Sequence, residues 1–346
     1  MATAPAPSAT SFGRVVGFFR RHPVLLLLCF SPGIPEYLSG SSSFALLALN
    51  PLGFLLFLGL NLGLYGPGVL LVREALVRWQ KGWAAVLALG AAYGLLEEGT
   101  ALSTLFDPNA RVVGGLGTYG HYLGVNWIWA IGVLQVHIVL SIGLPILLLG
   151  LALPETRGRS LLDRRQIGVA LGLLTADVVL LALLSHYYPT GLGLQLLALG
   201  CAAGLVVVAY RLPRGLLDPT SERPRFGRGT AFVLGLLFFP VLLIVPGILE
   251  STPLGAVAVG LLELLASGAL FFTVRHGIGR SGNEGHLVVL AFGALLPIAL
   301  FGLLAQLAVP VVAVADGLFA LFFYRLGRMY GVGASTGPPP VPSGAR

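Results

Sequence analysis

Residues 123–152 read LGVNWIWAIGVLQVHIVLSIGLPILLLGLA, a stretch without a single Asp, Glu, Lys or Arg. A helix needs roughly 20 apolar residues to cross the ~30 Å hydrocarbon core of a bilayer, and this stretch is longer than that. Its apolar residues run continuously and do not alternate with polar ones, so a membrane strand of a barrel is excluded. The stretch therefore predicts a transmembrane helix and places the chain among membrane proteins.

The rest of the chain repeats this pattern. Of the 346 residues, 56% are hydrophobic and 10% are charged, whereas soluble proteins carry about 25% charged residues. Continuous apolar runs predict an all-α, polytopic integral membrane protein with about ten transmembrane helices. We expect these spans at residues 16–38, 51–72, 84–106, 123–152, 167–186, 192–210, 230–249, 254–274, 286–305 and 308–326.

The basic residues indicate the orientation of these spans. Lys and Arg in short loops mark the cytoplasmic side of a membrane protein. With a cytoplasmic N-terminus and ten spans, 20 of the 21 Lys and Arg residues fall on the cytoplasmic side. Arg111, in the loop at about 107–122, is the exception. This asymmetry predicts that both termini are cytoplasmic.

We expect a single transmembrane domain at residues 16–330, flanked by disordered segments at 1–15 and 331–346. Its polar groups gather at 30–153, and the second half, 167–328, is plainer. The first apolar run lacks a small-residue cleavage site, which favours an uncleaved span over a signal peptide. Because the basic residues are dispersed in short loops, we expect a lipid bilayer as partner and no nucleic acid.

Two spans contain prolines that predict irregular helices. Pro67 lies inside the second span and removes a backbone hydrogen bond there. The fourth span is long and is expected to bend near Pro145. Irregular backbone in a membrane is tolerated where protein or a water-filled cavity accepts the freed groups. Prolines are also common in ordinary membrane helices, so this signal is ambiguous.

The strongest functional candidates are polar residues inside the spans. A charge at the bilayer centre costs about 2.5–3.5 kcal/mol even on lenient scales, so each such group suggests a function. Glu97 and Glu98 are expected in the outer half of the third span, and His137 at a similar depth in the fourth. Helical spacing predicts that Asn126, His137 and Ser141 share one face of the fourth span.

These groups allow three kinds of chemistry. Two neighbouring carboxylates can serve as base and acid toward a water, with His137 and Asn126 stabilising an oxyanion. A carboxylate and an imidazole can bind a divalent metal, or they can relay protons in a transporter. A purely structural pairing between helices is the remaining alternative. We assign Glu97, Glu98, His137 and Asn126 as catalytic candidates.

Three further residues are candidates for substrate binding. Glu36 ends the first span on the outer side, His121 precedes the fourth span in the outer loop, and Ser141 follows His137 by one helical turn. Because all three are expected on the outer side, they could converge with the glutamates on one cavity. Neither a metal, a cofactor nor a protein partner can be assigned from the sequence.

Single carboxylates also lie near the middle of three later spans, at Asp177, Glu263 and Asp316. Each could be a protonated, hydrogen-bonded structural group. If instead they face the same interior as the glutamates, they would extend a path for ions or protons across the membrane. A hydrolase needs only the first-half cluster, so the placement of these three carboxylates discriminates between the two functions.

Several segments resemble a group of uncharacterised bacterial multi-pass membrane proteins. The resemblance covers about the first 165 residues and implies a bacterial inner (plasma) membrane location. It is carried by 35–40 (PEYLSG), 64–66 (LYG), 71–74 (LVRE), 92–99 (AYGLLEEG), Asn126-Trp127, His137 and 141–146 (SIGLPI).

More distantly, a Glu-Glu pair in one membrane helix and a His in a later one are similar to the CAAX-prenyl-protease-like glutamate intramembrane proteases. The resemblance implies that Glu97 or Glu98 activates water and that His137 assists. That family follows its glutamates with an arginine, whereas residues 99–102 here are GTAL. From the Glu-Glu pair and the His we expect an intramembrane glutamate-protease-like hydrolase. The alternative is a transporter or permease-like protein.

Overall fold

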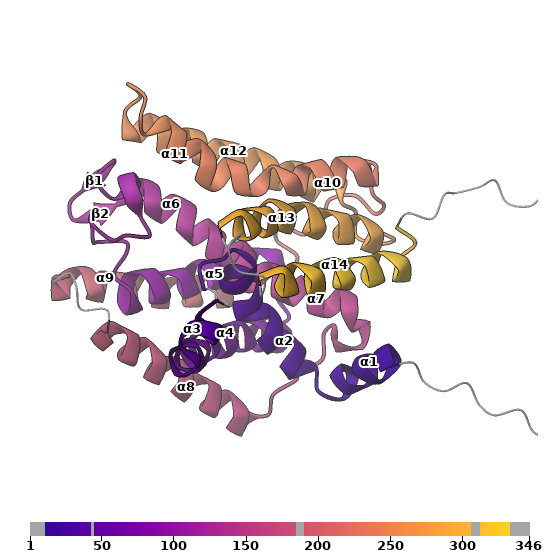
Figure 1. Ribbon diagram of the computed structural model, residues 1–346. Coiled ribbons are helices and arrows are strands. Elements are labelled where there is room, and N and C mark those ends of the chain that lie inside the picture. Colours follow the sequence, from indigo (N-terminus) through magenta and orange to yellow (C-terminus); the bar gives the residue numbers. More distant parts are fainter. Residues whose placement is uncertain (1–10, 43–44, 185–189, 306–311, 333–346) are drawn as a thin grey trace, which may run out of the picture.

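The computed structural model describes residues 11–42, 45–184, 190–305 and 312–332, and these form a bundle of helices (Figure 1). The α-helices are α1 (Ser11–Arg21), α2 (Pro23–Pro32), α3 (Ala45–Leu49), α4 (Pro51–Trp79), α5 (Trp83–Gly94), α6 (Trp127–Val136), α7 (Leu144–Ala152), α8 (Arg164–Leu184), α9 (Leu192–Arg211), α10 (Arg228–Leu236), α11 (Val245–Leu249), α12 (Ala256–Gly277), α13 (Glu284–Ala305) and α14 (Val312–Met329). Two-residue strands β1 (His121–Tyr122) and β2 (Val125–Asn126) form an antiparallel hairpin.

Seven helical segments among the described residues are long and apolar enough to cross a membrane. They begin at Pro51, Trp127, Arg164, Leu192, Arg228, Ala256 and Glu284 and match seven of the ten expected spans. The other three expected spans are also helical. The first is a shorter apolar helix, Pro23–Leu38, the third carries the two glutamates, and the tenth, α14, carries Asp316, Arg325 and Arg328.

Several expected boundaries need correction. The first apolar helix begins at Pro23 and not at 16, because the chain breaks at His22, between α1 and α2. The third span ends at Ala101 and the fourth begins at Trp127, so both are shorter than expected. Helix α4 continues through Pro67. Residues 11–15 form the start of α1, and residues 1–10, 306–311 and 333–346 lie outside the described residues.

The loops separate into two groups at opposite ends of the bundle (Figure 1). We call one the hairpin end, made of residues 102–126 and 249–256, where the Tyr119 hydroxyl donates to Leu254 O at 2.7 Å. We call the other the arginine end, made of residues 79–83, 153–163, 212–227 and 278–283. Hydrogen bonds connect its loops, from Lys81 Nζ to Leu212 O at 2.5 Å and from Arg280 Nε to Pro219 O at 2.7 Å.

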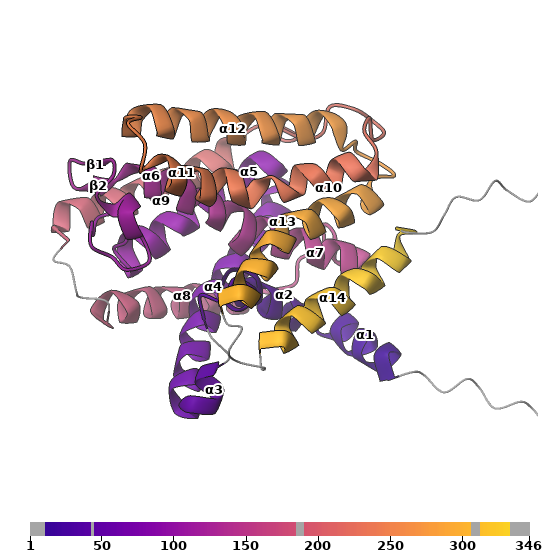
Figure 2. The same cartoon turned by 45° about the horizontal axis from the view of Figure 1, so that its top comes forward.

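Helix α1 and the end of α14 also lie at the arginine end. Arg20 contacts Glu155 at 3.4 Å, and the Tyr330 hydroxyl donates to Leu151 O at 2.9 Å. Helices α10 to α13 pack along one side of the bundle, with α12 at its edge, whereas α8 lies on the opposite side (Figure 2). Helices α10 and α13 approach closely, since a Cβ at Gly235 would lie 2.1 Å from Leu290 O.

Four segments in the described residues are π-helical, a wider turn in which the backbone bonds from residue i to i+5. They are η1 (Gly33–Leu38), η2 (Leu95–Ala101), η4 (His137–Gly143) and η6 (Pro240–Ile244). Proline explains three of them: η1 contains Pro35, η6 begins with Pro240, and η4 precedes Pro145, which has no N–H for the Ser141 carbonyl. The bend expected at Pro145 is therefore a π-helix just before it. Segment η2 contains no proline.

Candidate functional site

Three of the π-helical segments carry the polar candidates. Glu36 lies on η1, Glu97 and Glu98 on η2, and His137 and Ser141 on η4. Successive residues of an α-helix point about 100° apart, and the wider π turn reduces that angle. This change lets Glu97 and Glu98, although adjacent in sequence, both reach one imidazole. Single π turns in helices are frequently found at functional sites.

The two glutamates lie on either side of His137. Glu98 Oε1 is hydrogen-bonded to His137 Nε2 at 2.8 Å, and Glu97 Oε2 lies 3.3 Å from Nδ1. Nδ1 is also hydrogen-bonded to Ser141 Oγ at 3.0 Å. With its proton on Nε2, the neutral ring donates to Glu98 and accepts from the Ser141 hydroxyl. All four side chains are buried.

The two carboxylates differ in how they are held. Both oxygens of Glu98 are hydrogen-bonded, because the Thr104 hydroxyl donates to Oε2 and His137 bonds Oε1. Trp129 Nε1 in turn donates to Thr104 Oγ1 at 3.2 Å. Glu97 Oε2, in contrast, is buried without a hydrogen-bond partner among the described residues. Glu98 therefore anchors the imidazole, whereas Glu97 Oε2 faces His137 Nδ1 at 3.3 Å without a hydrogen bond among the described residues.

Small residues on α5 allow this helix and segment η4 to approach each other closely. A Cβ at Gly90 would lie 2.8 Å from Ile138 Cα, and one at Gly94 would lie 3.2 Å from His137 Cβ. Gly90 and Gly94 form a small-xxx-small pattern, which permits close packing of membrane helices. Between them, Tyr93 places its ring against that of His137, with centroids 5.8 Å apart. Sequence reasoning missed this role of Tyr93 and of Thr104, although the glycine spacing signalled the contact.

Glu36 lies beside this cluster in a hydrogen-bonded group of its own. The Tyr65 hydroxyl donates to Glu36 Oε1 at 2.6 Å, and the Ser42 hydroxyl donates to Oε2 at 2.7 Å. Tyr65 also interacts with Glu97, and Glu36 is close enough to interact electrostatically with Glu97 and His137. Glu36 therefore lies beside the Glu97–His137 cluster, and Tyr65 joins the two carboxylates.

Asn126 and His121 are placed differently from the sequence expectation. Asn126 precedes α6 as its N-cap and does not share a helical face with His137. Its amide donates at 2.8 Å to Thr104 O and at 2.8 Å to Asp107 O, and its Oδ1 is 2.6 Å from His121 Nδ1. Asn126 and His121 thus hold the loop after η2, and they reach the glutamates only through Thr104.

The Glu97, Glu98 and His137 side chains are also arranged as potential metal ligands. One ligand atom from each residue lies within 4.8 Å of the other two, and all three residues are buried. Catalytic zinc commonly takes three protein ligands of nitrogen and oxygen. In the geometry described, however, the carboxylates face different ring nitrogens. A metal ion bound by all three residues would therefore require the imidazole ring to rotate, so that one of its nitrogens and a carboxylate oxygen from each glutamate face the same point.

The second-half carboxylates lie apart from this cluster. Asp177 on α8 packs against Gly63 of α4, where a Cβ would lie 2.6 Å from Asp177 Oδ1. Glu263 on α12 faces Gly132 of α6 in the same manner, at 3.1 Å. Asp177 Oδ2 and both Glu263 oxygens are buried without a hydrogen-bond partner in the described part of the chain. Asp316 is half-buried on α14.

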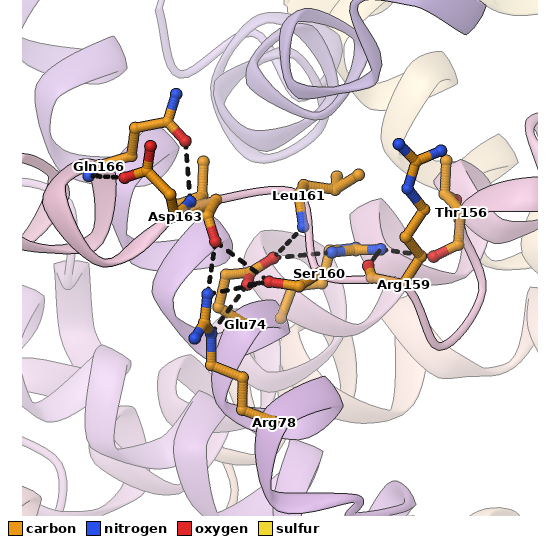
Figure 3. Close-up of polar contacts among 10 residues, drawn as sticks. Glu74, Arg78, Thr156, Arg159, Ser160, Leu161, Asp163 and Gln166 are labelled. Carbon is orange, nitrogen blue, oxygen red and sulfur yellow. Dashed lines mark hydrogen bonds and ion pairs between the residues drawn. The ribbon is translucent and has the colours of Figure 1, made fainter.

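A second buried polar cluster centres on Glu74 at the arginine end (Figure 3). Glu74 accepts from Arg73 at 3.0 Å, Arg78 at 3.2 Å, Ser160 Oγ at 2.5 Å and Leu161 N at 2.7 Å. Arg73 also donates to the carbonyls of the loop before α8. Both oxygens of Glu74 accept hydrogen bonds, so this cluster holds α4 against that loop and has a structural role.

Comparison with protein families identifies the larger group to which this bundle belongs. The model of an uncharacterised membrane protein family matches residues 25–326. The chain belongs to this family. The match includes the Glu97–His137 cluster and extends well beyond residue 165. No curated protein and no solved structure matches the chain.

Proposed function

We propose that the protein is a membrane-embedded hydrolase, similar in chemistry to the glutamate intramembrane proteases. The observation that carries the proposal is the buried arrangement of one imidazole between two carboxylates, of which Glu98 has both oxygens hydrogen-bonded and Glu97 has an oxygen without a hydrogen bond among the described residues. Polar groups buried in a bilayer are costly unless they are paired or used. The π-helical backbone at all three positions supports a functional origin for this arrangement.

In this proposal Glu97 is the general base. Its Oε2, which makes no hydrogen bond among the described residues, would accept a proton from a water molecule, whose oxygen would then attack the carbonyl carbon of a peptide bond. The same proton would pass to the leaving amine as the C–N bond breaks. His137, held by Glu98 through Nε2, would take up a second proton on Nδ1 and would then donate a hydrogen bond from Nδ1 to the developing oxyanion or to Glu97. Tyr65 and Glu36 would contact substrate at the edge of the cluster.

The proposal is tested by mapping new peptide ends. Purified protein is reconstituted in liposomes with detergent-extracted membrane proteins, and new N-termini are identified by mass spectrometry. We expect termini that appear with the wild-type protein and are reduced about 10²- to 10⁴-fold by Glu97→Gln, the range for loss of a general base. The same termini should persist with Glu263→Gln, a buried carboxylate outside the cluster.

Folding is checked separately by size-exclusion profile and thermal unfolding of each variant. Cleavage that survives in a folded Glu97→Gln variant overturns the proposed role of Glu97. Inhibition by a metal chelator, with recovery on adding zinc, would instead assign the three residues as metal ligands.

The alternative is a transporter, which is favoured by Asp177 and Glu263, because both have buried oxygens without a hydrogen bond in the described part of the chain. Protonatable groups in membrane spans mark proton and ion pathways in such proteins. Because the two residues lie between other helix pairs and not beside His137, a path would need to connect separate sites. Proton flux into liposomes that is lost with both Asp177→Asn and Glu97→Gln would support this alternative.

We also propose that ten helices span the membrane, with the arginine end in the cytoplasm of a bacterial inner membrane. The proposal is supported by the basic residues that gather at this one end, partly in its loops and partly in the helix ends that adjoin them. It is tested with single cysteines in a variant lacking Cys29 and Cys201. An impermeant thiol reagent added outside should label Thr118→Cys and not Ser281→Cys, and the reverse pattern would invert the topology.

A further inference from the structure

A cavity of about 520 Å³ lies at the arginine end, away from the Glu97–His137 cluster. It is bounded by α4, α5 and α7 and by the loops that follow α7, α9 and α12. The helices contribute mainly apolar side chains to its lining, including Leu76, Val86 and Leu149. The loops contribute basic side chains, including Lys81, Arg157 and Arg280. The lining therefore combines apolar and cationic groups.

The cations of this cavity are not fully neutralised. Arg73, also in the lining, is paired with Glu74 at 3.0 Å, and Arg157 lies 3.4 Å from Glu284. Lys81 and Arg280 donate to backbone carbonyls, which leave their charges in place. The one carboxylate in the lining is Asp218.

Lys81 and Arg280 thus face a single carboxylate, and neither forms an ion pair within the described residues. The lining therefore has an excess of one positive charge, which matches the single negative charge of a phosphodiester. Arginine and lysine are both strong donors to phosphate oxygens.

We propose that this cavity binds the headgroup of an anionic phospholipid, with the phosphate between Lys81 and Arg280. Basic pockets between membrane helices on the cytoplasmic side are suited to acidic headgroups. The apolar side chains that α4, α5 and α7 contribute can accommodate the first part of an acyl chain, and a free phosphate would leave them unused. Trp83, also in the lining, is a residue type that favours the membrane interface.

The experiment measures lipid retention by native mass spectrometry. Wild-type protein in detergent is exposed to equal amounts of phosphatidylglycerol and phosphatidylcholine. We expect phosphatidylglycerol to be retained preferentially, and a Lys81→Gln/Arg280→Gln variant to bind it about 30-fold more weakly, at roughly fivefold per removed charge. Arg111→Gln, which removes an exposed charge at the hairpin end, should bind like the wild type.

Asp218→Asn provides a test with the opposite sign. Removing the only carboxylate of the lining should tighten phosphatidylglycerol binding by about fivefold, which a misfolded variant would not do. Lys81→Arg, which keeps the charge, should retain binding even if the double variant does not fold.

The source of the phosphate is distinguished by thermal unfolding with millimolar inorganic phosphate. Stabilisation by phosphatidylglycerol and not by inorganic phosphate supports the lipid. Equal stabilisation by inorganic phosphate, lost in the double variant, would replace the lipid with a small anion. Equal retention of both lipids, or unchanged retention in the double variant, overturns the proposal.

Discussion

Two glutamates, Glu74 at the arginine end and Glu97 beside His137, are buried to the same degree, each with 2% of its surface exposed. Glu74 accepts hydrogen bonds from two arginines, a hydroxyl and a backbone amide (Figure 3). Glu97 keeps one oxygen without a hydrogen bond among the described residues. Native proteins satisfy nearly all buried polar atoms, so burial alone does not indicate function. A buried oxygen that makes no hydrogen bond is a better guide to function than burial is.

The largest effect is expected from Glu74→Ala. This change leaves Arg73 buried beside the loop before α8 without its carboxylate, and breaking a buried pair costs about 3–5 kcal/mol. Thermal or denaturant unfolding in detergent should therefore show a severe loss of stability. Exposed Glu155→Ala is the control. If Glu74→Ala unfolds like the control, the Glu74 cluster is not what fastens α4.

A smaller effect is expected from Gly94→Leu. The new side chain would collide with Leu134 and His137 and push α5 away, at a cost of about 1–3 kcal/mol. Because the same contact brings Glu97 and Glu98 to the imidazole, activity should fall as well. Gly204→Leu is the matched control, since a Cβ there meets nothing within 4 Å. Equal loss in both variants would show that helix propensity, not packing, is responsible.

Ser141→Ala should have a still smaller effect. It removes one hydrogen bond from His137 Nδ1, which contributes about 0.5–1.5 kcal/mol. The ring should remain attached to Glu98, so cleavage should weaken without disappearing. The measurement pairs unfolding with the rate of peptide-end formation. A rate equal to that of the wild type would remove Ser141 from the site.

The smallest change in stability is expected from Glu97→Gln. The amide keeps the shape of the carboxylate, Oε2 makes no hydrogen bond among the described residues, and its 3.3 Å contact with the unprotonated Nδ1 of a neutral His137 is not an ion pair, so the difference should be below about 0.5 kcal/mol. Function should nevertheless be lost. Glu74→Gln is the comparison, because there the new amide group faces donors on both sides and should destabilise the protein. Equal destabilisation by both changes would contradict the distinction between the two glutamates.

The sequence was sufficient to predict the membrane-protein class and the proximity of Glu97, Glu98 and His137. Long apolar runs have few physical alternatives to a membrane helix, and equal depth in two adjacent spans brings buried polar groups together. The catalytic role of these residues stays a prediction, as do the number of spans and their orientation.

Other features could not be predicted, because they depend on departures from regular helix geometry. The expectation that Asn126 and His137 share a face assumed a regular α-helix from about residue 123. The chain instead forms β2 at Asn126, starts α6 at Trp127 and widens into η4 at His137. The partners Thr104 and Tyr93 were missed because their contacts depend on the loop after η2 and on the glycines of α5.

Segment η2 makes the positions of Glu97 and Glu98 unusually sensitive to the deletion of a single residue. A π turn contains one residue more than an α turn would hold, so deleting Leu96 could convert η2 into ordinary α-helix without removing any polar group. Glu97 and Glu98 would then point about 100° apart around the helix axis, as successive residues of an α-helix do, and would no longer both reach His137. Among natural or designed variants, a one-residue deletion here should be more damaging than many substitutions, even where every functional side chain is still encoded.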